Sequence, residues 1–475
     1  MLSVPPFRPL VERLDPAPSA VDVFRALSHR PHSLFLDSAQ RDARLGRYSF
    51  VTADPFDFIT APAGSGCGLE GLAQRMSGMQ AATVAGLPPF QGGAAGLFGY
   101  DLNRDLERLP APVADEFHVP ALAIGLYDVV VAFDHQEKKA WIVSQGFPET
   151  DPHARRCRAK ARVAQVRGWL QEDHGQRSER STVVVGQLLK QDELGAVPAA
   201  KGPDGLRSSF TKEAFCQNVR RVLEYIHAGD VFQVNLSQRL LFPCRDDSVA
   251  LYLRLRSRNA APFAAYFDLG DFQLCSASPE RFLRVDRGHV EARPIKGTRS
   301  RMWRPEADLF AASDLEQSEK DRAENVMIVD LLRNDLSRTC RPESVHVAQL
   351  CGLERYAFVQ HLVSVVRGRL RSGMMPLDLL RTSFPGGSIT GAPKIRAMEI
   401  IAELEPVARG AYCGSVGYVG FDASLDTSIL IRTITAGAGW WQFPVGGGIV
   451  AQSVPEQEYE ETWHKAEGML RALMP

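Results

Sequence analysis

The sequence predicts an α+β protein in which much of the chain forms antiparallel β-sheet. Short segments with alternating apolar and polar residues recur along the chain, and turn-forming residues bound them. Longer amphipathic segments with helix start and stop signals lie between these segments. Together the two patterns indicate a sheet-rich body carrying several helices.

Composition and charge exclude several classes of protein. The chain has 475 residues, of which 45% are hydrophobic and 23% charged, and its formal net charge is −1. Length alone predicts roughly two to four domains. The near-neutral charge argues against nucleic-acid binding. The sequence has no run of about 18 apolar residues, so no membrane span is predicted. The absence of a signal-peptide pattern and of any CxxC pair among eight cysteines predicts a cytoplasmic protein with reduced thiols.

In the first third of the chain we expect a short helix, then strands, then a hairpin. The expected strands are 33–38 and 47–52, and the expected hairpin pairs 127–134 with 139–144. An arginine-rich amphipathic helix is expected at about 153–171, with a basic face more typical of a solvated surface than of a nucleic-acid interface. The polar segment 172–208 predicts a linker.

The remainder of the chain begins with a helix that Thr211 caps and that ends near Gly229. Period-2 alternation over 231–240 predicts a strand directly after it. Further strands are expected at 264–269, 273–277, 282–285, 416–421, 428–436 and 439–446. Further helices are expected at 320–333, 375–384, 393–404 and 456–474.

The segment 294–301, Pro-Ile-Lys-Gly-Thr-Arg-Ser-Arg, is the most informative for function. We expect it to follow an extended segment, with Gly297 forming a turn that presents Lys296 at the rim of a site. A lysine is a poor nucleophile unless burial or nearby cations lower its pKa. Three arginines would serve as such cations and would also hold an anionic substrate: Arg293, Arg299 and Arg301. A solvated basic surface turn explains the same octapeptide.

Two predicted helices each carry two carboxylates three residues apart, which places each pair on one helix face. The first pair is Asp321 and Glu324, and the second is Glu458 and Glu461. The pairs would together hold one hard cation such as Mg²⁺, which retains water ligands and is completed by an anionic substrate. Taken singly, either helix is more simply explained as a solvated acidic face.

Two glycine-rich segments, 384–394 and 445–449, are candidate anion sites, because backbone N–H groups at a helix N-terminus bind anions. Arg432, at the end of a predicted strand, would clamp a carboxylate with two hydrogen bonds. Glu280 lies 16 residues before Lys296, across an apparent hairpin. The two side chains would divide the roles of acid and nucleophile, or would form an ordinary ion pair.

These motifs together resemble the chorismate-utilising enzymes, which include anthranilate, aminodeoxychorismate, isochorismate and salicylate synthases. Across 209–475 they occur in the order SPERF, PIKGT, AENVMIVDLLRNDL, QHLVS, PGGSITGAPK, YCGSVGY, IRT, GGGIV and EYEET. FLDS at 35–38 and PFQGGAAGLFGYDL at 89–102 extend the resemblance into the N-terminal third. The resemblance implies a single interwoven unit of two face-to-face, mainly antiparallel β-sheets flanked by helices. An N-terminal region (1–171), the linker (172–208) and a chorismate-binding catalytic region (209–475) are then divisions of sequence more than of space.

Two positions indicate which branch of the family this chain resembles. Lys296 in PIKGT is the mark of aminodeoxychorismate synthase component I, whereas anthranilate synthases carry alanine there. Gln233 stands where isochorismate and salicylate enzymes place a lysine that activates water. The resemblance therefore implies conversion of chorismate and ammonia into 4-amino-4-deoxychorismate, for p-aminobenzoate and folate synthesis. Anthranilate synthase component I and a catalytically silent regulatory subunit remain the alternatives.

The resemblance also implies roles for individual residues. Mg²⁺ would be held by Glu324 and Glu461, with Asp321 and Glu458 acting through water. Glu280 would protonate the departing 4-hydroxyl of chorismate, Lys296 would attack ring atom C2, and ammonia would then displace the lysine at C4. The residues expected to bind the substrate are Thr298, His361, Thr390, Gly391, Tyr412, Arg432, Gly446, Gly447 and Gly448.

Two partners follow from the same resemblance. The sequence contains no glutaminase motif, so ammonia would come from solution or from a separate glutamine amidotransferase subunit. In the N-terminal sheet of this family a tryptophan can be bound, and the matching positions are Ser38, Pro262 and Phe263. An ordinary core with a buried hydroxyl is the alternative explanation for those three residues.

Overall fold

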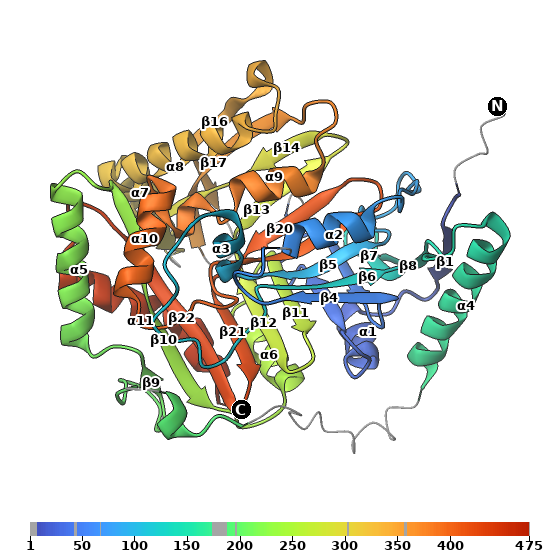
Figure 1. Cartoon of the computed structure of the whole chain (residues 1–475), viewed down its shortest axis with the longest axis horizontal. Coiled ribbons are helices and arrows are strands. Elements are labelled where there is room, and N and C mark those ends of the chain that lie inside the picture. The colour runs from blue at the N-terminus through green and yellow to red at the C-terminus, as the bar shows by residue number, and fades with distance from the viewer. Residues whose placement is uncertain are drawn as a thin grey trace.

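Two large, mainly antiparallel β-sheets with helices around them make up the protein, in a computed structural model (Figure 1). The structure describes residues 7–41, 45–66, 68–172, 188–194, 197–301, 304–355 and 359–474. None of the helices in these ranges is long and apolar enough to cross a membrane.

The first sheet has 12 strands, and all but one lie in the order β1-β8-β7-β3-β2-β11-β12-β21-β22-β10-β18, with β9 paired to β10. Its strands are β1 (Leu10–Leu14), β2 (Leu34–Asp37), β3 (Tyr48–Thr52), β7 (Val129–Asp134), β8 (Lys139–Ser144), β9 (Arg207–Ser208), β10 (Gln233–Pro243), β11 (Phe263–Asp268), β12 (Phe272–Ser278), β18 (Gly391–Ala392), β21 (Thr433–Gly437) and β22 (Trp440–Ile449).

The second sheet has 10 strands in the order β15-β17-β14-β13-β20-β19-β5-β6-β4, with β16 paired to β17. Its strands are β4 (Asp57–Ala61), β5 (Gly93–Phe98), β6 (Leu122–Tyr127), β13 (Arg281–Asp286), β14 (His289–Ala292), β15 (Ile295–Ser300), β16 (His346–Arg355), β17 (Val359–Arg369), β19 (Ser415–Gly420) and β20 (Leu425–Ile429).

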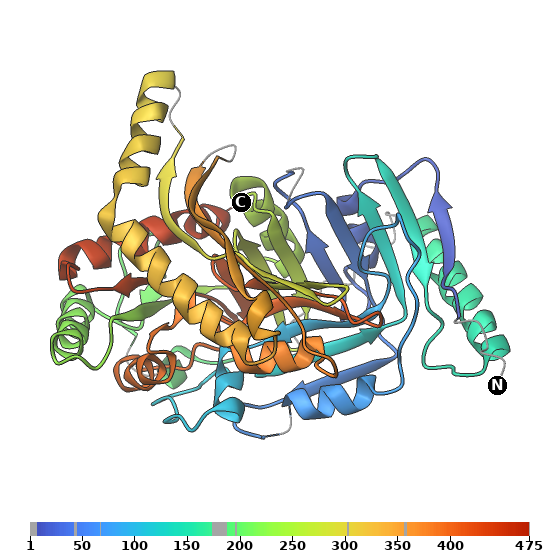
Figure 2. The ribbon, with the colours of Figure 1, turned by 90° about the horizontal axis from the view of Figure 1, so that it is seen from above.

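The α-helices connect and cover these sheets, and in Figure 2 α7 extends away from the rest of the protein. They are α1 (Ala20–Leu27), α2 (Gly68–Met76), α3 (Asn103–Leu106), α4 (Pro152–Gln171), α5 (Lys212–His227), α6 (Ser248–Arg258), α7 (Pro305–Gln317), α8 (Glu319–Ser337), α9 (Pro376–Ser383), α10 (Lys394–Leu404) and α11 (Pro455–Ala472). Short 3-10 turns lie at η1 (Tyr100–Leu102), η3 (Gln191–Leu194), η4 (Pro342–Ser344) and η5 (Gly387–Ile389).

Strands from distant parts of the sequence pair directly in both sheets. In the first sheet β2 pairs with β11, and in the second β5 pairs with β19. A buried core of aromatic and aliphatic side chains contains residues of both sheets, including Phe50 of β3, Phe267 of β11 and Tyr418 of β19. This arrangement confirms the predicted single unit of two interwoven antiparallel sheets.

Local signals placed most elements correctly. The side chain of Thr211 accepts a hydrogen bond from the N–H of Ala214 at the start of α5, and the helix ends next to Gly229. The single strand expected at 428–436 is wrong: it is two strands, β20 in the second sheet and β21 in the first. The chain crosses between the sheets at Arg432, whose φ is +54°.

Parts of the segment 172–208 are packed against the body of the protein. Leu194 is buried in the core between the sheets, and β9 pairs with β10. Residues 173–187 and 195–196 of this segment lie outside the described residues.

Candidate active site

Lys296 lies inside β15, not on the turn that the sequence analysis expected. The pairing of β15 with β17 shifts register between Lys296 and Thr298, and Gly297 occupies the resulting bulge with φ +72°. A Cβ at Gly297 would lie 2.7 Å from Leu315 and 2.9 Å from Asp321, so a side chain is excluded there. The bulge re-aims the Lys296 side chain, which is 12% exposed, toward α8 and the loop before α10.

The three arginines near Lys296 each pair with a carboxylate, and Arg299 also lies 3.5 Å from Asp321 of α8. Each forms an ion pair with a carboxylate: Arg293 with Glu354 at 2.6 Å, Arg299 with Asp314 at 2.8 Å, and Arg301 with Asp308 at 2.9 Å. The groups that do contact the Lys296 ammonium are the carbonyl oxygen of Ser388 at 3.3 Å and a carboxylate oxygen of Glu324 at 3.7 Å.

Glu280 lies between β12 and β13 and is 4% exposed. Burial raises its pKa to about 7, although a hydrogen bond from Ser388 and the charge of Lys296 both favour the ionised form. A large fraction of this carboxyl is therefore protonated at neutral pH, which suits a general acid.

Glu280 and Lys296 do not face each other across one hairpin. Strands β13 and β14 form the hairpin that follows Glu280, and Lys296 belongs to the next strand. Ser388 brings the two together: its hydroxyl donates to Glu280 Oε1 at 2.9 Å, and its carbonyl accepts from Lys296. The glycine-rich segment 384–394 is a candidate site from its sequence, but nothing local distinguishes Ser388 within it.

The segment 384–394 is folded against the strands rather than left open for an anion. The N–H groups of Ile389 and Thr390 donate within the loop, and the Thr390 hydroxyl donates to the carbonyl of Gly386 at 3.0 Å. Thr390 is fully buried, and its carbonyl accepts from the N–H of Asn235 in β10. Gly391 has φ +137°, and a Cβ there would collide with the carbonyl oxygen of Gln233.

The guanidinium of Arg432 is buried and forms no ion pair with the residues that the structure describes. Burial lowers the pKa of its guanidinium, and it makes no hydrogen bond or ion pair with any residue in the described ranges. The charges that act on it most are those of Tyr412 and Glu461. Tyr412 is 5% exposed, and burial raises the pKa of its phenol. A buried arginine whose N–H donors have no partner among the described residues is suited to bind an anion.

His361 lies beside Arg432 in the same region. Burial lowers the pKa of His361 to about 4, the charge of Arg432 lowers it further, and a hydrogen bond with the backbone of Gly297 opposes these effects. The imidazole is therefore neutral at neutral pH. Thr298 pairs with His361 through the β15–β17 register, and only its backbone is described.

Gly446, Gly447 and Gly448 lie within β22, and the expectation of a loop before the last helix is wrong. They pair with Ser237, Leu236 and Asn235 of β10, in that order. A Cβ at Gly447 would lie 3.4 Å from Glu458 and 3.5 Å from Glu461, so the bare backbone of this strand faces the carboxylates of α11.

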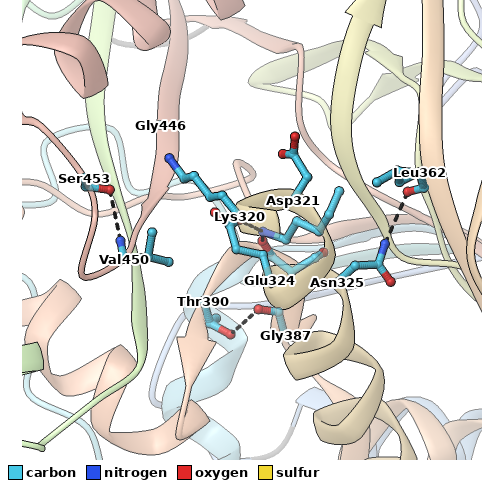
Figure 3. Close-up of polar contacts among 12 residues, drawn as sticks. Lys320, Asp321, Glu324, Asn325, Leu362, Gly387, Thr390, Gly446, Val450 and Ser453 are labelled. Atoms are coloured by element: carbon cyan, nitrogen blue, oxygen red, sulfur yellow. Dashed lines mark hydrogen bonds and ion pairs between the residues drawn. The ribbon is translucent and has the colours of Figure 1, made fainter. Parts of the chain in front are cut away.

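The carboxylate pairs of α8 and α11 lie near one another, since the charges of Asp321 and Glu461 both act on Glu324. Lys320 on α8 lies 3.5 Å from Glu458 on α11, and Lys465 on α11 lies 2.6 Å from Glu461. Figure 3 shows Asp321 and Glu324 on α8 together with Thr390 and Gly446.

Four basic side chains pair with these carboxylates: Lys296 with Glu324, Lys320 with Glu458, Lys465 with Glu461, and Arg299 with Asp321. Burial raises the pKa of Glu324, whereas at Glu461 the burial effect is outweighed by Lys465 and the pKa is lowered. Among the described residues no three His, Cys, Asp or Glu side chains are arranged to hold a metal ion. The donors are all carboxylate oxygens, however, and that chemistry fits Mg²⁺ rather than zinc.

The three residues matched to a tryptophan pocket line one cavity. Ser38, Pro262 and Phe263 border a space of about 280 Å³ between the sheets, which Arg47 and Tyr418 also line. The Ser38 hydroxyl donates to the carbonyl of Tyr48 at 2.5 Å.

Comparison with known proteins identifies the family of this chain. A model of the chorismate binding enzymes matches residues 46–471. The chain belongs to the chorismate-binding enzyme family. It is 39% identical to the aminodeoxychorismate synthase component 1 of Salmonella typhimurium, over 98% of both chains. It is also 43% identical to the anthranilate synthase component 1 of Thermus thermophilus, over 82% of this chain and 78% of that one.

Solved structures of the family agree with the fold. Anthranilate synthase component I of Streptococcus pneumoniae superposes with a TM-score of 0.74 at 28% identity, covering 90% of this chain and 93% of that one. The menaquinone-specific isochorismate synthase of Escherichia coli superposes at 0.70 with 18% identity, covering 99% and 96%, which shows a shared fold.

Proposed function

We propose that this chain is aminodeoxychorismate synthase component I, which converts chorismate and ammonia into 4-amino-4-deoxychorismate. The observation that carries the proposal is the pairing of a lysine with a protonated carboxyl: Lys296 and Glu280 contact the same serine, Ser388. A relative that shares 39% identity over the full chain bears this name.

Chorismate carries two carboxylates, and the site offers matching groups. Arg432 supplies the unpaired guanidinium, with Tyr412 next to it. The substrate's other carboxylate would approach the backbone of Gly446–Gly448 and the facing helices. Thr298, His361, Thr390 and Gly391 would border the ring, and the neutral imidazole of His361 adds no charge that would compete with Arg432.

The reaction begins when Glu280 donates its proton to the 4-hydroxyl, which leaves as water. The Nζ lone pair of Lys296 forms a bond to C2, and both conjugated ring double bonds shift, through C1, C6 and C5, as the C4–O bond breaks. Ammonia then attacks C4, both double bonds shift back, and the C2–N bond breaks to release the lysine amine. The lysine attacks as the free amine, so its proton must leave before the first step. Lys296 is 12% exposed, so this proton would pass to solvent.

Mg²⁺ would be held by Glu324 and Glu461, with Asp321 and Glu458 acting through water. When bound, it would neutralise a substrate carboxylate and withdraw electron density from the ring. The protein's own contribution there is to place acidic oxygens on two facing helices and to balance them with lysines.

Gln233 favours ammonia over water as the incoming nucleophile. Its side chain is fully buried, and neither of its amide atoms has a hydrogen-bond partner among the described residues. An amide cannot remove a proton from water, whereas ammonia needs no base before it attacks. Ammonia would come from a glutamine amidotransferase subunit, as the name "component 1" of the relatives implies for those proteins.

The test is the product formed from chorismate, Mg²⁺ and ammonium by the purified chain, identified by mass. We expect 4-amino-4-deoxychorismate, and Lys296→Ala should reduce its rate at least about 100-fold because the nucleophile is gone. Formation of anthranilate and pyruvate would instead assign the chain to anthranilate synthase component I, a function that the 43% identical relative carries.

The cavity at Ser38, Pro262 and Phe263 supports a second, separate proposal, that the chain binds tryptophan. The cavity is lined by aromatic rings and arginines, which suit an aromatic amino acid with a carboxylate. Calorimetric titration with tryptophan tests the idea, and Phe263→Ala should weaken binding. An absence of heat at millimolar tryptophan would rule it out.

A further inference from the structure

We propose that the buried ion pair of Arg409 and Glu405 is a positioning device for the loop that carries Ser388. Only the expected effect on turnover depends on the proposed function. The pair bonds the loop and strand β10, and neither of its residues forms a hydrogen bond or ion pair with Lys296 or Glu280.

The guanidinium of Arg409 joins three segments that are far apart in sequence. It donates to both carboxylate oxygens of Glu405, at 2.8 and 2.7 Å. It also donates to the carbonyl of Ile389 at 3.1 Å and to the carbonyl of Asn235 at 2.6 Å. Its side chain is 2% exposed and lies over the ring of Tyr100 at 4.7 Å. A single planar group therefore connects the loop, strand β10 and the end of α10.

Glu405 completes the connection from the other side. Its Oε1 accepts hydrogen bonds from the N–H and the hydroxyl of Ser237, both at 2.8 Å, so the carboxylate is also tied to β10. The Glu405 carboxylate therefore accepts four hydrogen bonds, two from Arg409 and two from Ser237, although its side chain is only 5% exposed. A buried pair of this kind is costly to break, because the remaining charge has no solvent.

The consequence for the site follows from chain connectivity. Ile389, which Arg409 holds by its carbonyl, directly follows Ser388, and Thr390 is bonded through its own carbonyl to Asn235. Ser388 in turn fixes Glu280 and Lys296 relative to each other. Arg409 thus sets the distance between acid and nucleophile without contacting either, and a displacement of about 1 Å would reduce turnover by about 100-fold.

Only arginine fits this position. The four acceptors are bonded by three different nitrogen atoms of the guanidinium, whereas a lysine ammonium supplies three donors from one atom and does not reach them all. Arg409→Lys therefore keeps a positive charge beside Glu405 but should lose the hydrogen bond to the carbonyl of Ile389 or to that of Asn235.

A matched control is available on β10, the strand that Arg409 bonds through Asn235. Arg239 of β10 is equally buried and forms a two-bond pair with Glu116 at 3.0 and 3.1 Å, but it does not bond the loop. Arg409→Lys and Arg239→Lys should lose similar amounts of thermal stability. Hydrogen exchange of the backbone amides of 386–392 is the readout that separates them, together with kcat and KM for chorismate.

We expect Arg409→Lys to speed exchange in 386–392 at least about tenfold and to lower kcat by about 10- to 100-fold, with KM changed less than threefold. Arg239→Lys should leave both the exchange of that segment and kcat within about twofold. Equal effects in the two variants, or unchanged exchange in Arg409→Lys, would overturn the inference.

Two further results keep the test decisive. If Arg409→Lys does not fold, Glu405→Gln retains the shape of the pair and should show the same exchange and kcat pattern, about threefold to tenfold weaker. If the unmodified chain does not turn over chorismate with ammonium, the proposed function fails, and the exchange measurement alone decides whether Arg409 positions the loop.

Discussion

Replacement of Glu280 by glutamine tests the central electrostatic argument, because glutamine copies the neutral form of the carboxyl. Burial raises the pKa of Glu280 to about 7, compared with 4.5 for a free glutamate. The difference corresponds to about 3 kcal/mol of free energy of unfolding. Between these two pH values the folded chain binds more protons than the unfolded chain. Stability from this group is therefore complete below about pH 4.5 and is lost as the pH rises through about 7.

Glu280→Gln should therefore stabilise the protein at high pH and much less at low pH. Urea unfolding at pH 5 and pH 8 measures the effect, and we expect the advantage of the variant to be larger at pH 8 by about 2 to 3 kcal/mol. The exposed Glu343→Gln serves as control and should show no such dependence. Turnover of chorismate should fall by about 100-fold or more, since the general acid is absent.

A pH-independent difference between Glu280→Gln and the unmodified chain would refute this reasoning. It would mean that Glu280 is ionised in the folded protein at neutral pH and that Ser388 and Lys296 outweigh burial. Retained turnover would separately show that another group protonates the leaving hydroxyl.

Three further predictions concern the substrate, the metal and the backbone. Arg432→Lys should weaken chorismate binding by about tenfold to 100-fold in a calorimetric titration, with little change in stability because Arg432 has no partner among the described residues; unchanged affinity would remove it from the carboxylate site. Glu324→Gln should weaken Mn²⁺ binding, followed by electron paramagnetic resonance, by about tenfold or more, and equal binding in both proteins would mean that Glu324 is not a metal ligand. Gly391→Ala should destabilise the chain by about 2 kcal/mol or more, because φ is +137° and the Cβ meets Gln233. Its control is Gly168→Ala on α4, where nothing lies within 4 Å of the added Cβ, and this change should stabilise the protein by about 0.5 to 1 kcal/mol. Equal effects of the two substitutions on stability would contradict the backbone argument.

Local spacing was enough to predict much of the protein. The cap at Thr211 and the period-2 strand after it depend on neighbouring residues only, and both lie where the sequence placed them. The i, i+3 carboxylates on α8 and α11 share a helix face for the same reason. The ordered motifs also predicted the fold of two interwoven sheets, which the pairing of β2 with β11 and of β5 with β19 confirms.

Long-range contacts decided the rest of the site. No local pattern shows that the segment 428–436 breaks at Arg432 to cross between the sheets, because the break depends on which neighbours each half pairs with. Gly446–Gly448 read as a loop but form a strand, since β10 supplies their hydrogen-bond partners. The arginines around Lys296 read as its cationic neighbours, yet carboxylates from other segments engage them.

The sequence by itself determined the chemical inventory: a lysine, an acid, an arginine and four carboxylates on elements of known type. The tertiary structure alone decided which of these groups meet. Ser388 joins Glu280 to Lys296, and Arg409 holds the loop that carries Ser388, across separations of 108, 92 and 20 residues. The physical reason is that burial and hydrogen bonding between distant segments set both the pKa of Glu280 and the geometry of the site, and neither is encoded in local spacing.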